Sequence, residues 1–211
     1  MNILVICDDR WHPARTPRAG LTNLEAHGFH FDWIENAADW SAQKMESFPL
    51  VLLTKSNNVS SLDETQWMTL QVEDAFRNYV ERGHGLLAVH SGTAGYSDAS
   101  ILRSLLGGIF VQHPAQCQVT VEPLADHPLT RGVAPFTLQD EHYFMTCDDP
   151  ELDVFLTTRS ENGVQPGGWT RQQGSGRVCV LTPGHNLEIW QHPSFERLLL
   201  NALNWCAQAA G

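Results

Sequence analysis

The 211-residue sequence contains no run of lysine or arginine, and its formal net charge is -11 with histidine counted as neutral. Proteins that bind nucleic acids usually present a basic face to the phosphates, so this composition argues against a nucleic-acid partner. The five cysteines are scattered and include no C-x-x-C pair. An odd, unpatterned set argues against both a disulfide scaffold and a zinc ribbon.

The chain also begins without a basic leader, and no stretch approaches the length of a membrane span. We therefore expect a cytoplasmic protein with no membrane partner. Repeats, low-complexity tracts and linkers are absent, so one domain over residues 1–211 is the simplest organisation. No H-x-x-x-H or H-x-H spacing occurs, so any metal site must be assembled from distant segments.

The sequence does contain a series of short apolar runs separated by helical patterns. The runs that predict buried strands cover residues 3–7, 29–34, 50–54, 86–89 and 177–181. Four apolar residues in a row between glycines, as at 86–89, are typical of a parallel strand covered on both faces. The alternation of strands and helices predicts an α/β fold with right-handed crossovers and mostly parallel strands.

Residues that favour the beginning or end of a helix lie between these predicted strands. Thr16-Pro17 predicts a helix that runs to about His27, with the threonine as N-cap. The capping box Ser61-x-x-Glu64 predicts a second helix that ends at Gly83. A short helix is expected over residues 99–106 and an amphipathic one over residues 193–207.

The pattern changes after residue 108. Residues 117–121, 136–144 and 153–158 alternate between polar and apolar types, which is typical of antiparallel or edge strands in a mixed sheet. The segment Pro166-Gly-Gly-Trp169 predicts a turn. The second half of the chain is therefore expected to extend the parallel sheet with antiparallel edge strands.

The candidate catalytic residues are His90, Glu141 and His185. His90 and His185, together with His12, directly follow predicted parallel strands, whose carboxyl ends share one edge of a doubly wound sheet. Glu141 lies in a charged stretch within an otherwise apolar segment, and buried charge requires partners or solvent. We therefore expect the three histidine side chains to converge, although a lone histidine is more often structural than catalytic.

The turn Val89-His90-Ser91-Gly92 resembles the nucleophile elbow of class I glutamine amidotransferases, which has the pattern G-x-C-x-G. His90 stands at the cysteine position and Ala88 replaces the first glycine. Because thioester chemistry requires a thiolate, the sequence excludes glutaminase activity.

A wider resemblance covers nearly the whole chain. It is carried by the segments Gly85–His90, Leu105–Pro114, Asp126–Gly132, Asp140–Tyr143, Trp169–Arg171 and Gly174–Val178, and by Pro183–His185 with the helix after Pro193. In this order they resemble the ThuA-like family, named for trehalose utilisation, within the glutamine-amidotransferase-like superfamily. The resemblance implies a flavodoxin-like three-layer α/β sandwich and a link to sugar catabolism. It also implies functional positions at His90, His113, Glu141 and His185, and His12 joins them because of its position.

Three hypotheses about function follow. The first is an enzyme that acts on a carbohydrate or keto-sugar, in which His90, Glu141 and His185 perform acid–base chemistry beside a carbonyl. Its substrate-binding residues would be Trp11, His12, Ser91, His113, Tyr143 and Trp169, of which the aromatic ones could stack on a sugar ring.

The second hypothesis adds a divalent metal such as zinc, held by His90, His113, Glu141 and His185, which gives a metal-assisted hydrolase or isomerase. The third is a non-catalytic sugar-binding module. The tryptophan content is compatible with a homodimer under each hypothesis.

Overall fold

The computed structural model describes residues 1–150 and 152–208. A nine-stranded sheet has the order β2-β1-β3-β4-β11-β10-β9-β6-β7, and β5 and β8 form a separate two-stranded sheet. The strands are β1 Asn2–Cys7, β2 His30–Ile34, β3 Leu50–Thr54, β4 Gly85–Val89, β5 Gly108–Gln112, β6 Cys117–Pro123, β7 Phe136–Asp140, β8 Phe144–Cys147, β9 Asp153–Ser160, β10 Gly163–Gln173 and β11 Gly176–Leu181. The α-helices are α1 Arg15–Leu21, α2 Ala42–Glu46, α3 Leu70–Glu81, α4 Ser100–Leu106, α5 Leu187–Trp190 and α6 Pro193–Ala207, with short 3-10 turns at Thr22–His27, Ala37–Asp39, His90–Thr93 and Pro128–Thr130.

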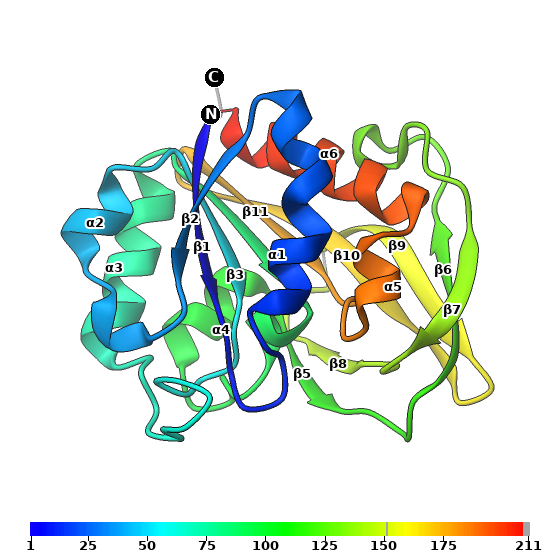
Figure 1. Ribbon diagram of the computed structural model, residues 1–211, viewed down its shortest axis with the longest axis horizontal. Coiled ribbons are helices and arrows are strands. Elements are labelled where there is room, and N and C mark those ends of the chain that lie inside the picture. The colour runs from blue at the N-terminus through cyan, green and yellow to red at the C-terminus, as the bar shows by residue number, and fades with distance from the viewer. Residues whose placement is uncertain (151, 209–211) are drawn as a thin grey trace.

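The large sheet is parallel in one half and antiparallel in the other. Strands β2, β1, β3, β4 and β11 run parallel, whereas β10, β9, β6 and β7 pair antiparallel. Helices α1, α5 and α6 pack on one face and α2, α3 and α4 on the other, each set with its own apolar core (Figure 1). The three-layer α/β sandwich expected from the sequence is confirmed, and within the described residues no helix has the length and apolar character needed to cross a membrane.

Two expected helix starts are wrong. Ser61 caps no helix, because residues 60–65 form a turn in which the Ser60 hydroxyl accepts from the backbone of Leu62 and Asp63. Helix α3 begins only at Leu70, where the Thr69 hydroxyl accepts from the Val72 amide. Helix α1 begins at Arg15 without a side-chain cap, so Thr16 and Pro17 lie in its first turn, and its continuation to His27 is a 3-10 helix.

Two further expectations fail in the antiparallel half. Residues 166–169 do not form a turn; they lie inside β10, at an irregular pairing with β9 between Pro166 and Trp169. A bulge accommodates the proline, which has no N–H to donate. The predicted strand over 136–144 is broken at residues 141–143 into β7 and β8, which belong to different sheets. Strand β5 was not anticipated. The break matters because it releases Glu141 from the sheet.

Candidate functional site

A pocket of about 510 Å³ opens at the carboxyl edge of the parallel strands. Its lining includes His12 from the loop after β1, Ser56 from the segment after β3 and His185 from the segment after β11. Glu141 enters from the break between β7 and β8, and Phe110 comes from β5. In Figure 1 the loop after β1 and the strands β5 and β8 are found in the lower part of the view.

Three of the lining side chains form a tight group with the buried His90, which does not itself line the pocket. One ligand-type atom from each of His12, His90, Glu141 and His185 lies within 4.8 Å of the corresponding atoms of the other three. We call this group the His–Glu cluster. The ring centroids of His12 lie 5.0 Å from those of both His90 and His185. The predicted convergence of His12, His90 and His185 at one sheet edge is therefore confirmed.

His90 projects from a strained turn directly after β4. Its φ is 49°, in the left-handed region that costs an ordinary residue roughly 1–2 kcal/mol. The turn presses against β3, because a Cβ on Gly92 would lie 2.0 Å from the Leu53 carbonyl oxygen. The backbone therefore has the strained strand-to-helix geometry of a nucleophile elbow, with an imidazole at the nucleophile position.

The His90 imidazole is 1% exposed, and the Tyr143 ring stacks on it at 3.9 Å. Its Nδ1 donates to the Thr182 carbonyl oxygen at 2.8 Å, so its unprotonated Nε2 faces the cluster. Burial lowers the pKa of His90 to about 4, against the opposing effect of the Glu141 carboxylate. His90 is thus a neutral imidazole near neutral pH.

Glu141 is the shared partner of three histidines. Its Oε2 lies 3.4 Å from His90 Nε2 and 3.1 Å from His185 Nδ1, and its Oε1 lies 3.6 Å from His113 Nε2. Burial favours a raised pKa for Glu141, but His185 and His90 outweigh it and hold the pKa well below its usual range. For His185 burial favours a lowered pKa, yet the acidic neighbours, Glu141 first among them, raise it.

Asp9 orients His12, a role that the sequence analysis did not predict. Its Oδ1 accepts from His12 Nδ1 at 2.7 Å and from the amides of Trp11 and His12, and its Oδ2 accepts from the Ser56 amide. Although burial opposes it, these donors lower the pKa of Asp9 to about 2, which keeps the carboxylate ionised. Its place directly after the first strand was the available signal.

Asp140 was also missed as a positioning residue. This fully buried carboxylate accepts from the amides of Gly184, His185 and Asn186 at 2.9–3.1 Å, and so holds the loop that carries His185. Burial raises its pKa to about 6, against the effect of these amides. The two acidic residues of this charged stretch therefore have different roles: Asp140 fixes a loop, and Glu141 faces the cluster.

The sequence matches the ThuA family, described as trehalose utilisation, over residues 2–206. The chain belongs to the ThuA family. No curated protein matches it.

Among solved structures, a ThuA-like protein from Parabacteroides merdae is similar at a TM-score of 0.77 and 17% identity, over 99% of this chain and 90% of that one. A ThuA-like protein from Bacteroides uniformis follows at 0.72 and 19%, over 98% and 91%. A cytoplasmic protein from Salmonella typhimurium LT2 reaches 0.72 at 16% identity, over 98% and 97%. At these identities the structures support the fold.

Not every residue expected in this ThuA site lies there. Trp11, His113 and Tyr143 line the pocket, whereas Trp169 and Ser91 do not. Trp169 is fully buried and donates from Nε1 to the Leu106 carbonyl oxygen at 2.8 Å, so it is a core residue. Ser91 is fully buried in the turn beneath the pocket. The expected stacking role of Trp169 and contact role of Ser91 are therefore wrong, because packing removed both side chains from the surface.

The expected metal set also changes. The converging group contains His12 where the sequence had suggested His113. The His113 side chain is more exposed than the four side chains of the cluster, and its Nε2 faces the other carboxylate oxygen of Glu141, Oε1. Its Nδ1 donates to the Pro114 carbonyl oxygen at 2.7 Å. It therefore flanks the cluster.

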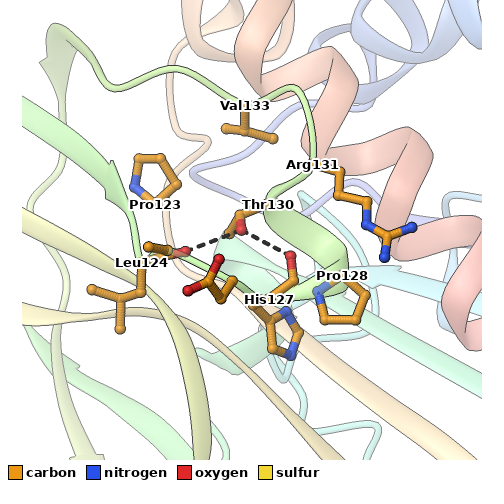
Figure 2. Close-up of a pocket in the computed structure, with 9 residues that line it drawn as sticks. Pro123, Leu124, His127, Pro128, Thr130, Arg131 and Val133 are labelled. Atoms are coloured by element: carbon orange, nitrogen blue, oxygen red, sulfur yellow. Dashed lines mark hydrogen bonds between the residues drawn. The ribbon is translucent and has the colours of Figure 1, made fainter.

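Residues 126–132, another segment that carries the ThuA resemblance, lie at a second pocket. Nine residues between Pro123 and Val133 line a hollow of about 460 Å³ that shares no lining residue with the His–Glu pocket. Figure 2 shows the Thr130 hydroxyl between the carbonyl oxygens of Leu124 and His127, which lie 3.0 and 2.9 Å away and share its single proton. His127 Nδ1 in turn accepts from the Leu129 amide, so this motif closes a turn and serves the fold.

Proposed function

We propose that this ThuA-family protein is an enzyme that acts on a carbohydrate, or on a keto-sugar formed from one, and that the reaction takes place at the His–Glu cluster. The observation that carries the proposal is the convergence of three imidazoles and one carboxylate at a pocket open to a small molecule. A cytoplasmic location belongs to the same proposal. Glutaminase activity does not, because His90 stands at the position where that chemistry needs a thiolate.

Three properties of the pocket suit a sugar. Aromatic surface from Trp11 and Phe110 supplies faces for the apolar C–H side of a pyranose, and Trp11 is 66% exposed. The polar groups are concentrated on the cluster side, where hydroxyl or carbonyl oxygens would meet histidine and carboxylate. A volume of about 510 Å³ lies within the usual range for small-molecule sites.

The charges of the cluster suit chemistry next to a carbonyl. The neutral His90 and the ionised Glu141 are acceptors, and the raised pKa of His185 favours its protonated, donating form. Such a set can move a proton on and off a carbon beside a carbonyl, as isomerisation, epimerisation and elimination require. The same side chains can instead hold a metal that polarises the carbonyl, the alternative favoured by the further inference below.

The test is a turnover screen with a matched set of variants. Untagged protein is incubated with trehalose, related disaccharides and their keto derivatives, and products are followed by NMR. We expect Glu141→Gln and His185→Gln to lower turnover by roughly 100-fold or more while sugar binding persists. His27→Gln, at an exposed histidine outside the pocket, is the control and should match the wild type.

Two results would oppose this proposal in different ways. Sugar binding without turnover in any condition would favour the non-catalytic module, in which the cluster serves recognition alone. Binding and turnover that are both insensitive to Glu141→Gln would remove the reaction from this pocket.

A further inference from the structure

Hydrogen bonds on the outer side of the His–Glu cluster orient two of its imidazole rings. The other nitrogen of each ring, which can bind a metal, then faces the centre of the cluster. His90 Nδ1 donates to the Thr182 carbonyl, and His12 Nδ1 donates to the Asp9 carboxylate. Each bond fixes a proton on Nδ1 and leaves the Nε2 of that ring unprotonated, and the Nε2 of His12 also lies 3.5 Å from the Tyr143 hydroxyl, at the outer limit of a hydrogen bond. Histidines that bind metals are oriented by the same kind of outer partner, a carbonyl or a carboxylate.

Two inward nitrogens have the Glu141 carboxylate as a close neighbour but make no hydrogen bond with it. His90 Nε2 and His185 Nδ1 are buried and make no hydrogen bond to another described residue, although both lie near the same oxygen of Glu141. A buried polar atom without a partner costs roughly 1–3 kcal/mol, so a native structure normally supplies one. A cation bound between these atoms would supply it to both.

The spacing is also close to that of a coordination shell. Nitrogen and oxygen donors at about 2.0–2.2 Å from a tetrahedral zinc lie roughly 3.3 Å from one another. Two donor separations, 3.4 Å from His90 Nε2 and 3.1 Å from His185 Nδ1 to Glu141 Oε2, already have this length. The full set of four lies within 4.8 Å, so small side-chain rotations suffice to close it.

We propose that His12, His90, His185 and Glu141 bind one divalent transition-metal ion of the zinc class. Three imidazoles and one carboxylate are a donor set typical of such ions, and they disfavour magnesium and calcium, which prefer oxygen. The inference deepens the proposed function and rests on it for the ion's catalytic purpose. Binding of the ion, however, can be measured with no sugar present.

The ligand set differs from the one that family resemblance alone suggested, because His12 is a ligand and His113 is not. His113 Nε2 lies 3.6 Å from Glu141 Oε1, the oxygen on the other side of the carboxylate. His12 and His113 are therefore a matched pair, since both line the pocket and only one belongs to the converging group.

The experiment measures metal binding by untagged protein stripped with a chelator and dialysed into chelator-free buffer. Zn²⁺ is titrated by calorimetry against a competing chelator, and Co²⁺ is used as a visible probe of the ligand field. We expect one ion per wild-type chain, and a loss of affinity of about 100-fold or more in His12→Gln and Glu141→Gln. Asp9→Asn should weaken binding by about 10–100-fold through His12, and His113→Gln should stay within about threefold of the wild type.

Several outcomes would overturn the inference. Less than half an equivalent of tightly bound Zn²⁺, or equal binding by wild type and all variants, would mean that only surface histidines take up metal. Loss of binding in His113→Gln but not in His12→Gln would transfer the site to the other ligand set. Circular dichroism of each metal-free variant separates these outcomes from misfolding, and the Co²⁺ spectrum of Asp9→Asn gives a reading from a variant that keeps all four ligands.

The sugar screen separates this inference from the proposed function. Turnover that survives chelation, in protein that binds no metal, would refute the metal site and still support the proposed enzyme. A metal that binds through His12 in a protein that turns over no sugar would do the reverse.

Discussion

The Nδ1 atom of His90 lies 2.8 Å from the carbonyl oxygen of Thr182, at the end of the neighbouring parallel strand. A carbonyl can only accept, so this bond assigns the ring proton to Nδ1. The parallel pairing of β4 with β11 brings the two residues together, since both strands end at the same edge. The partner that sets the tautomer is therefore provided by the sheet itself.

This tautomer should be visible by NMR. With the pKa of His90 lowered to about 4, the metal-free protein should show a neutral, Nδ1-protonated His90 from pH 8 down to about pH 5.5. Long-range nitrogen–proton correlation spectra of ¹⁵N-histidine-labelled protein report the tautomer directly, and His90→Asn identifies the signal. An Nε2-protonated ring, or protonation near pH 6.5, would contradict the assignment.

Asp9 should stabilise the fold in a pH-dependent manner. Its pKa falls from 3.8 to about 2 on folding, and a shift of that size corresponds to about 2 kcal/mol of unfolding free energy. Because the folded pKa is depressed, this contribution is complete above about pH 5 and is lost as the pH falls toward 2.

Asp9→Asn should therefore be less stable than the wild type by about 2 kcal/mol at pH 7, and the gap should shrink by about 1 kcal/mol at pH 3. Urea unfolding at pH 7, 5 and 3 measures it. A gap that stays constant over this range would mean that the charge of Asp9 does not contribute.

The turn that carries His90 should not tolerate a side chain at position 92. A methyl group there would meet the Leu53 carbonyl oxygen at 2.0 Å, and backbone atoms cannot move aside cheaply. Gly92→Ala should lower the unfolding free energy by about 3 kcal/mol or prevent soluble expression. Ser97→Ala, at an exposed position of the same connection, is the matched control and should unfold within about 0.5 kcal/mol of the wild type.

Trp11 and Trp169 should separate binding from stability. Trp169→Phe removes a buried hydrogen bond to Leu106 and part of the core, so it should cost about 2 kcal/mol of stability and leave ligand affinity unchanged. Trp11→Ala removes an exposed ring from the pocket, so it should weaken sugar binding by about tenfold with little effect on unfolding. Calorimetric binding and thermal melts of both variants give the comparison, and a reversed pattern would refute both assignments.

The sequence by itself determined the parallel strands and the location of the site. Apolar runs such as residues 86–89 can be buried on both faces only inside a sheet, and parallel strands place their carboxyl ends at one edge. For that reason His12, His90 and His185 could be expected together, and the thioester chemistry of the superfamily could be excluded from residue 90 alone. Glu141 was a candidate from its charged stretch, and the family motifs pointed to it as well.

Only the tertiary structure decided which side chains complete the cluster and which are buried in the core. The sequence does not distinguish Trp169 from Trp11 as a sugar-stacking residue. In the structure Trp169 is buried in β10, inside the sheet, whereas Trp11 is exposed in the loop after β1. The choice of His12 over His113, and the support from Asp9 and Asp140, depend on distances between segments that are far apart in the chain. Local residue patterns specify which elements form and which face they bury, whereas side-chain convergence depends on how those elements pack.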